Sequence, residues 1–238
     1  MKNLTYTLWV VLLIAACSPL KNSKTVESHI PSLGAIGQED KSLFGSLFLQ
    51  IGHPKIMAPI ALGATETPFS KSSFKTYRTH LESKGEEAKI TYVDSSKVKP
   101  KYLCLEITDK IALQTQLNAE ENKSVRNYLS KDTHNMVSKI SFVASEQVRS
   151  QITDARALFL SQNNHGVLGI SVIQRNTTHF LPMSDLETFS FKTSGFCWGK
   201  NIYGQLEIDA IVSSDNRCPK GTEEDAYKLT ETKSYLKL

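Results

Sequence analysis

Glycine and proline are scarce in this chain, with 12 and 8 among 238 residues. Collagen-like and low-complexity architectures need far more of both and are therefore excluded. Neither sign of charge dominates, because 28 Lys and Arg stand against 24 Asp and Glu. The formal net charge of +4 is too small and too dispersed to mark a nucleic-acid-binding surface, so we expect no nucleic-acid partner.

The chain also lacks an apolar run of the roughly 20 residues that a membrane-spanning helix needs. Its longest candidate, residues 8–16, follows a single positive charge at Lys2 and ends in small residues just before Cys17. A basic start, a short apolar stretch and small residues at the cut are typical of a secretory signal peptide. We therefore assign residues 1–16 to a signal peptide and exclude them from the fold.

The four residues Ile14-Ala15-Ala16-Cys17 resemble the lipobox of bacterial lipoproteins. In that family the matching cysteine receives a diacylglyceryl group, the signal peptide is cut just before it, and the new N-terminus is acylated. The resemblance makes Cys17 the lipidated first residue of the mature protein, with each buried acyl CH₂ worth about 0.8 kcal/mol of membrane binding. It also implies a location in the cell envelope. Because Ser18 and not aspartate follows the cysteine, the outer membrane facing the periplasm is favoured.

The rest of the chain divides into a tether and one domain. Residues 17–40 combine the lipidated cysteine with Ser, Lys, Pro and Gly in no periodic pattern, which predicts a flexible tether. Residues 41–238 have the length and hydrophobic content of a single domain.

Hydrophobic residues in this domain mostly recur with a period of two, which is typical of strands. The predicted strands are residues 89–93, 102–108, 139–143, 158–161, 167–173, 188–192, 206–212 and, at the end, 227–235. Residues 163–166 (NNHG) predict a hairpin turn, and residues 118–121 (NAEE) a helix capping box. Residues 42–50 fit either a helix or a buried strand. The predicted fold is mainly β: an antiparallel sandwich or an α+β sheet with one or two short helices.

Three cysteines remain once Cys17 is assigned to lipid. In an oxidising envelope a disulfide is the default for a well-placed pair. Cys197 and Cys218 both lie where a strand gives way to a loop, and closing about 20 residues between them is worth about 3 kcal/mol. Cys104 alternates with leucines and indicates a buried small side chain. We predict a Cys197–Cys218 disulfide; a bond from Cys104 to either, or no bond, are the alternatives.

Aromatic residues are concentrated in residues 194–204 (SGFCWGKNIYG). Phe196, Trp198 and Tyr203 are candidate ligand-contacting residues, because rigid aromatic rings on a loop can stack on a sugar or a partner protein. The alternative interpretation is that Trp198 covers the disulfide and fills the core.

Searches for catalytic patterns identify no catalytic residue, metal ligand or cofactor site. There is no Walker loop, dinucleotide fingerprint, nucleophile elbow or zinc-binding histidine pair. Carboxylate pairs for glycoside hydrolysis are spatial and cannot be read from sequence; the candidates considered are Glu106, Glu187, Glu207 and Asp209. The leading hypothesis is a membrane-anchored, non-enzymatic binding or assembly module for an envelope protein or glycan. The alternative is a lipid-anchored glycan hydrolase of the cell envelope.

Overall fold

The computed structural model describes residues 30–42 and 45–230, so the predicted signal peptide, Cys17 and residues 231–238 lie outside the described part. Its strands are β1 (Ile36–Ser42), β2 (Gly45–Gly52), β3 (Ile60–Pro68), β4 (Lys101–Ile107), β5 (Asn135–Val143), β6 (Ala157–Gln162), β7 (Leu168–Gln174), β8 (Thr177–Pro182), β9 (Glu187–Lys200) and β10 (Leu206–Ser213). Its helices are α2 (Lys71–Lys84), α3 (Lys110–Asn118), α4 (Lys123–Leu129), α5 (Glu146–Thr153) and α6 (Tyr227–Thr230), with short 3₁₀ turns η1 (Glu120–Asn122) and η2 (Met183–Asp185).

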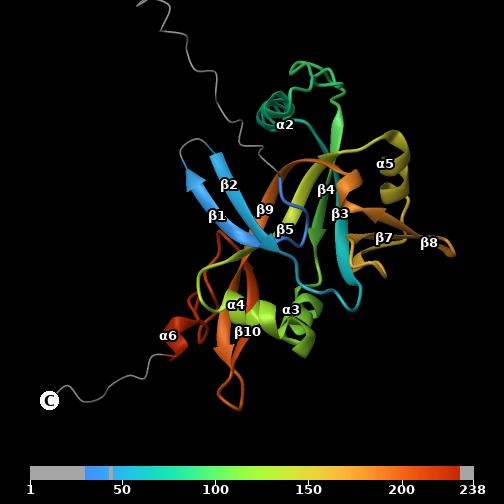
Figure 1. The fold of residues 1–238 in the computed structure, drawn as a ribbon. Coiled ribbons are helices and arrows are strands. Elements are labelled where there is room, and N and C mark those ends of the chain that lie inside the picture. Colours follow the sequence, from blue (N-terminus) through green and yellow to red (C-terminus); the bar gives the residue numbers. More distant parts are fainter. Residues whose placement is uncertain (1–29, 43–44, 231–238) are drawn as a thin grey trace, which may run out of the picture.

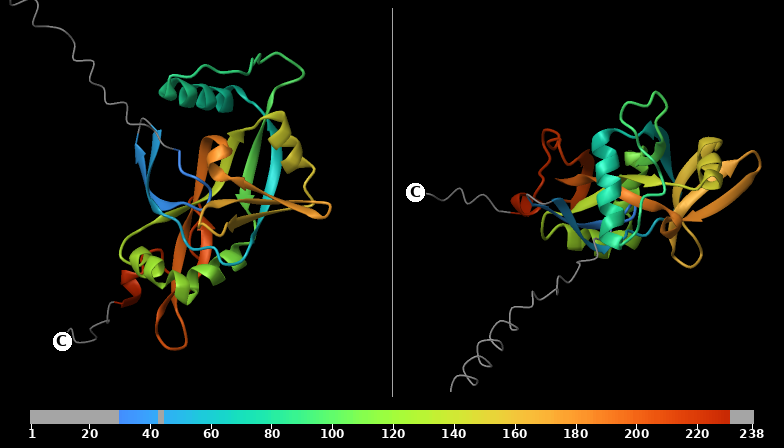
Figure 2. Two further views of the ribbon diagram at one scale, coloured as in Figure 1. Left: turned by 45° about the vertical axis from the view of Figure 1, so that its right-hand side comes forward. Right: turned by 90° about the horizontal axis from the view of Figure 1, so that it is seen from above.

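The strands form one antiparallel sheet, in the order β10-β9-β5-β4-β3-β6-β7-β8, and the hairpin of β1 and β2 joins β5. The predicted mainly β fold is confirmed, with more helices than the one or two expected. Figures 1 and 2 show α3 and α4 together at one end of the sheet and α2 at the opposite end. The β1–β2 hairpin and the strands β7 and β8 stand on opposite sides of the molecule (Figure 1).

Alternation along the strands supplies the main core. On β4, Leu103, Leu105 and Ile107 are buried, whereas Glu106 is exposed and receives a bond from Lys139 at 2.9 Å. Strands β3, β5, β6 and β7 contribute further residues with no exposed surface, namely Ile60, Met136, Leu160 and Ile170. The alternating leucines of β4 thus face the core as the period-two pattern predicts, whereas β3 was not among the predicted strands.

The predicted capping box at residues 118–121 is wrong. Asn118 ends α3, and its side-chain amide bonds both main-chain groups of Ile208 on β10, at 2.9 Å to the nitrogen and 2.7 Å to the oxygen. A capping box does occur at Ser70 and Ser73, at the start of α2. The asparagine is thus used for tertiary pairing, which competes with local capping and leaves no sequence signal.

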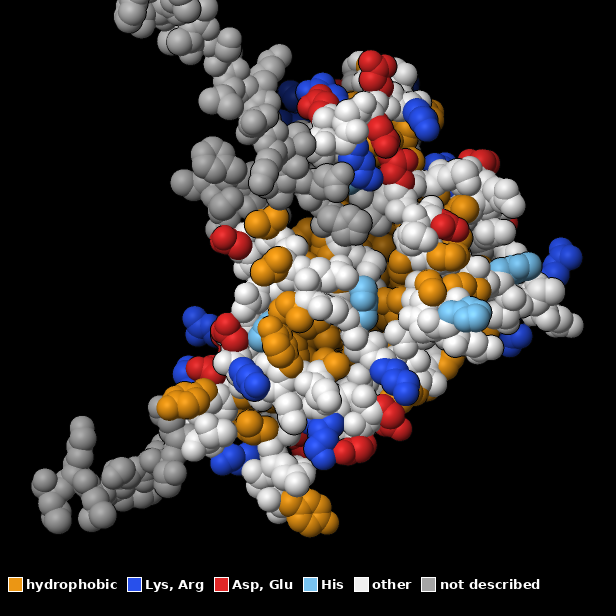
Figure 3. Space-filling model, in the orientation of Figure 1, with side chains coloured by type: hydrophobic (Ala, Val, Ile, Leu, Met, Phe, Trp, Pro, Cys, Tyr) orange, Lys and Arg blue, Asp and Glu red, His pale blue; other side chains and the backbone are white. Residues whose placement is uncertain are grey.

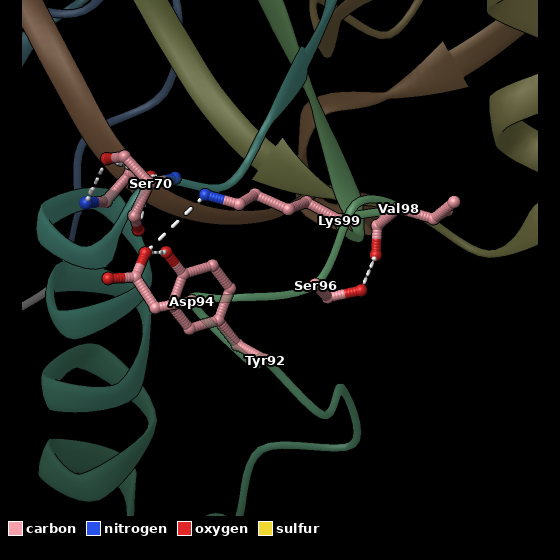
Figure 4. Close-up of polar contacts among 7 residues, drawn as sticks. Ser70, Tyr92, Asp94, Ser96, Val98 and Lys99 are labelled. Atoms are coloured by element: carbon pink, nitrogen blue, oxygen red, sulfur yellow. Dashed lines mark hydrogen bonds and ion pairs between the residues drawn. The ribbon is translucent and has the colours of Figure 1, made fainter.

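The strand predicted at residues 89–93 is also absent; this segment is a loop following α2. Ile90 and Tyr92 pack instead on a second hydrophobic cluster beneath α2, built on Phe69, Tyr77, Leu81 and Phe189. Within the loop, the Tyr92 hydroxyl donates to Asp94 at 2.7 Å, and Lys99 lies 3.5 Å from the same oxygen (Figure 4). Apolar side chains thus alternate here because they face a helix.

The tether predicted for residues 17–40 is too long, because residues from Leu33 onward belong to the fold. Leu33 and Ala35 have no exposed surface, and β1 begins at Ile36. Residues 42–50, left open between helix and strand, lie mostly in β2. At the other end, residues 227–230 form α6, so the described part of the predicted strand 227–235 is helical.

Candidate functional site

The aromatic segment, residues 194–204, begins in a corner of the sheet where the side chains are buried, here called the closed end of β9. Residues up to Lys200 continue β9, and Phe196 and Trp198 are only 4% and 2% exposed. The main chain of Trp198 bonds Glu223 in both directions, at 2.7 and 3.0 Å. Ligand contact by Phe196 and Trp198 is therefore wrong, and the alternative interpretation, in which Trp198 fills the core, is confirmed. Tyr203 alone of the three is exposed, at 81%, in the turn that follows β9.

The predicted disulfide between Cys197 and Cys218 is confirmed, with the two Cα atoms 5.5 Å apart. It ties the segment after β10 back onto β9 beside Trp198. Cys104 is a buried free thiol, as predicted, within 3.4 Å of the Ser141 hydroxyl on the neighbouring strand β5.

A cleft of about 890 Å³ opens at the other end of β9. Figure 3 shows this face hollowed between the β1–β2 hairpin and the strands β7 and β8, with hydrophobic side chains and a histidine inside. The walls come from the segment before β1, the end of β2, the last turn of α2, the β6–β7 turn and the start of β9. The lining residues are Ile30, Ser32, Gln50, His53, His80, Ser83, Lys84, Glu86, Gln162, Gly166, Leu168, Met183, Ser184, Leu186 and Thr188.

His53 begins a stretch without regular structure between β2 and β3, which is held by amide side chains. Asn122 has no exposed surface; it accepts from the Lys55 nitrogen and donates to the Lys55 oxygen, each at 2.8 Å. Gln116 similarly accepts from Met57 at 2.8 Å and donates to Ala58 at 2.7 Å. The two side-chain amides bond main-chain groups of residues 55–58 as a neighbouring strand would. The segment's buried main-chain groups therefore have partners, and its position is fixed.

Gln162, which itself lines the cleft, completes this support. Its side chain accepts from the Ile56 nitrogen at 2.9 Å and donates to the Pro54 oxygen at 3.4 Å. The residue directly after His53 is therefore anchored to β6, and the histidine is placed on the cleft wall by fixed backbone.

Two histidines on the cleft walls are held mainly neutral near pH 7. His53 Nε2 lies 2.7 Å from the Ser32 hydroxyl, and burial lowers the pKa of His53. Burial also lowers the pKa of His80, and the nearby charge of Lys84 adds to that effect. Both ring nitrogens of His80 are buried and have no hydrogen-bond partner among the described residues.

The carboxylates considered for glycoside hydrolysis lie outside the cleft. A bulge in β10 between Ile208 and Ala210 interrupts the alternation that would align Glu207 with Asp209. Glu106 is paired with Lys139, and Glu187 acts with burial to raise the pKa of Tyr77 to about 12. Among the described lining residues, Glu86 is the only acidic one.

No group of three or more His, Cys, Asp or Glu in residues 30–42 and 45–230 is arranged to hold a metal ion. Within the same residues, no helix has the length and apolarity required to cross a bilayer. Comparison with protein-family models, with curated proteins and with solved structures gives no match to this chain.

Sequence reasoning did not identify Ser32, His53 or His80. The residues that line the cleft come from segments far apart in the sequence, and no motif with a fixed residue spacing links them. His53 and His80 are isolated histidines in the sequence, and Ser32 lies within the predicted tether.

Proposed function

We propose that this chain is a lipid-anchored protein of the bacterial cell envelope whose β domain binds a ligand in the cleft. The lipobox resemblance at Cys17 supports the anchor. The Cys197–Cys218 disulfide supports an oxidising compartment such as the periplasm. The observation that carries the binding role is the cleft itself, because about 890 Å³ falls within the range of small-molecule sites.

The lining favours a hydroxylated ligand such as an envelope glycan. Most of the polar groups are uncharged and can both donate and accept hydrogen bonds, as in Ser32, Gln50 and Thr188. Leu168, Met183 and Leu186 add apolar surface against which the less polar face of a sugar ring can pack. Lys84 and Glu86 carry opposite charges, so neither sign of ligand charge is selected.

A glycan hydrolase is less well supported. Glycosidases of the usual kind need two carboxyl groups roughly 5–10 Å apart across the scissile bond. The described walls of this cleft offer one carboxylate, that of Glu86. We therefore favour ligand capture over glycoside cleavage.

The anchor is tested by Cys17→Ser in the native host. We expect the variant to lose its acyl groups and to move from the membrane to the soluble fraction, because the acyl chains are the membrane attachment that we propose. Fractionation and mass spectrometry of the N-terminal peptide measure this. An unmodified cysteine in the wild-type protein, or unchanged fractionation of the variant, would contradict the anchor.

The ligand site is tested by filling the cleft. Ser184→Trp places a large ring on an exposed wall position, and we expect at least a tenfold loss of affinity for envelope glycan fragments in calorimetry. Ile202→Trp makes a large aromatic substitution at a position 91% exposed and outside the cleft, and it should bind as the wild type does. Equal binding by both variants would refute the assignment of the site.

A further inference from the structure

We propose that Ser32 and His53 form a nucleophile–base pair that hydrolyses carboxylic esters carried by a hydroxylated ligand in the cleft. This inference rests on the cleft being the ligand site and goes beyond ligand capture. Its first support is contact: Ser32 Oγ and His53 Nε2 are 2.7 Å apart, within the distance at which a histidine can take a proton from a serine.

Both partners are held by fixed backbone. Ser32 opens a turn in which Ala35 donates to the Ser32 oxygen at 3.0 Å, and Gly34 adopts the φ of +83° that this turn requires. On the other side, the residues after His53 are fixed by Gln162 and Asn122. A pair positioned in this way needs little reorganisation before reaction, which is the arrangement that catalysis favours.

The site is also accessible and its base is available. Ser32 and His53 are each half-buried and line the cleft, so a bound ligand can reach them. Burial lowers the pKa of His53, which keeps the imidazole neutral and able to accept a proton near pH 7.

The reaction balances with water as the only co-reactant. Ser32 Oγ forms a bond to the ester carbonyl carbon while its proton passes to His53 Nε2. The carbon–oxygen bond to the alcohol breaks, and His53 returns the proton to that alcohol. Water then repeats the sequence on the acyl-serine, which releases the carboxylic acid and regenerates the hydroxyl group of Ser32.

The substrate class follows from the two kinds of wall. The polar side chains suit a hydroxylated alcohol portion, and the apolar side chains of Leu168, Met183 and Leu186 suit a small acyl group. Lys84 is the one Lys or Arg among the described lining residues, so the described walls carry little positive charge that would select an anionic substrate. We infer that O-acylated sugars are the substrate class.

The test is covalent labelling of the full lipidated protein in detergent by an alkyl fluorophosphonate, with the modified peptide identified by mass spectrometry. We expect an adduct on Ser32, and at least a 100-fold slower labelling rate in Ser32→Ala and His53→Gln. Ser95→Ala is the matched control: this serine is exposed in the loop after α2 and does not line the cleft, so its loss should leave labelling unchanged.

Hydrolysis of p-nitrophenyl acetate by the same four proteins provides a second measurement. We expect a burst of p-nitrophenol release from the wild type and the control. Loss of this burst in Ser32→Ala and His53→Gln, and in no other protein of the four, supports the pair. The pair is overturned if the folded wild-type protein forms no adduct, if the adduct lies on another residue, or if His53→Gln is labelled as fast as the wild type. Equal labelling of His53→Gln is the result expected if the Ser32–His53 hydrogen bond only fixes residues 30–35. If glycan binding persists without an adduct, only the pair is refuted. If an adduct forms without glycan binding, only the glycan-binding function is refuted.

Discussion

The two ends of strand β9 differ in how well the surrounding side chains are packed and in how many buried polar groups have a hydrogen-bond partner. At the C-terminal end, Phe196 and Trp198 fill the core, the main chain of Trp198 is paired with Glu223, and a disulfide closes the corner. At the N-terminal end, Thr188 borders a cleft whose wall includes His80, a buried imidazole without a described partner. One strand thus joins a region built for stability to a region that retains unsatisfied polar groups, which is where binding sites are expected.

The largest effect should come from removing the aromatic filling of the closed end. Trp198→Ala should lower the free energy of unfolding by about 3–5 kcal/mol, because a large cavity replaces a buried ring. Urea denaturation measures the loss. Tyr203→Ala, at an exposed position, should change it by less than about 0.5 kcal/mol. Equal effects of the two substitutions would show that Trp198 is not a core residue.

The second-largest loss of stability should come from removing the Cys197–Cys218 disulfide. The Cys197→Ala, Cys218→Ala double variant should lose about 3 kcal/mol, since the loop that the bond closes spans 21 residues. If the two ends of β9 are independent of each other, glycan binding in the cleft should persist under conditions where the variant remains folded. Loss of binding by a folded variant would instead show that the ends are coupled.

At the cleft end, the amide support of the His53 segment should have a smaller effect. Asn122→Ala leaves both main-chain groups of Lys55 without their bonds and should cost about 1–3 kcal/mol. It should also weaken cleft binding, because the segment positions His53. Asn127→Ala, at an exposed position on α4, is the control and should alter neither stability nor affinity.

The smallest effect concerns pH. Because burial lowers the pKa of His80 in the folded state, the unfolded chain binds more protons below about pH 6.5, and stability should fall as pH falls. One histidine contributes at most about 1.4 kcal/mol per pH unit. His80→Phe should flatten this dependence in urea denaturation at pH 5–7. His165→Phe, at the exposed β6–β7 turn, is the matched control. An unchanged slope in His80→Phe would contradict the burial of a neutral imidazole.

Sequence reasoning predicted the disulfide at the closed end of β9 but did not decide the burial of its aromatic rings, and it did not bring the cleft residues together. The disulfide, the buried Cys104, the mainly β fold and the turn at residues 163–166 follow from local pattern, and each agrees with the structure. The choice between loop and core for Trp198 depended on tertiary context and could not be made locally. The strand expected at residues 89–93 was wrong for the same reason, since its apolar residues pack on α2.

The cleft residues escaped prediction because their roles depend on distant partners. Nothing near Asn122 or Gln116 in the sequence indicates that their amides would hold residues 55–58. The contact between Ser32 and His53 joins a segment that resembled a tether to a segment without regular structure. Such pairs are visible only once the sheet has brought the segments together.

The sheet pairs strands that are distant in the chain, and this governs the order in which the domain can assemble. Ile36 of β1 pairs with Met136 of β5, and Ile60 of β3 pairs with Leu160 of β6, so about a hundred residues separate each pair. Long separations of this kind slow folding, because the entropy of closing the loop is lost before the contacts form. The β1–β2 hairpin must therefore wait, unpaired with β5, until more than half of the polypeptide is available. Because we propose that this chain is exported to the cell envelope, we expect the delay to help keep it unfolded until export.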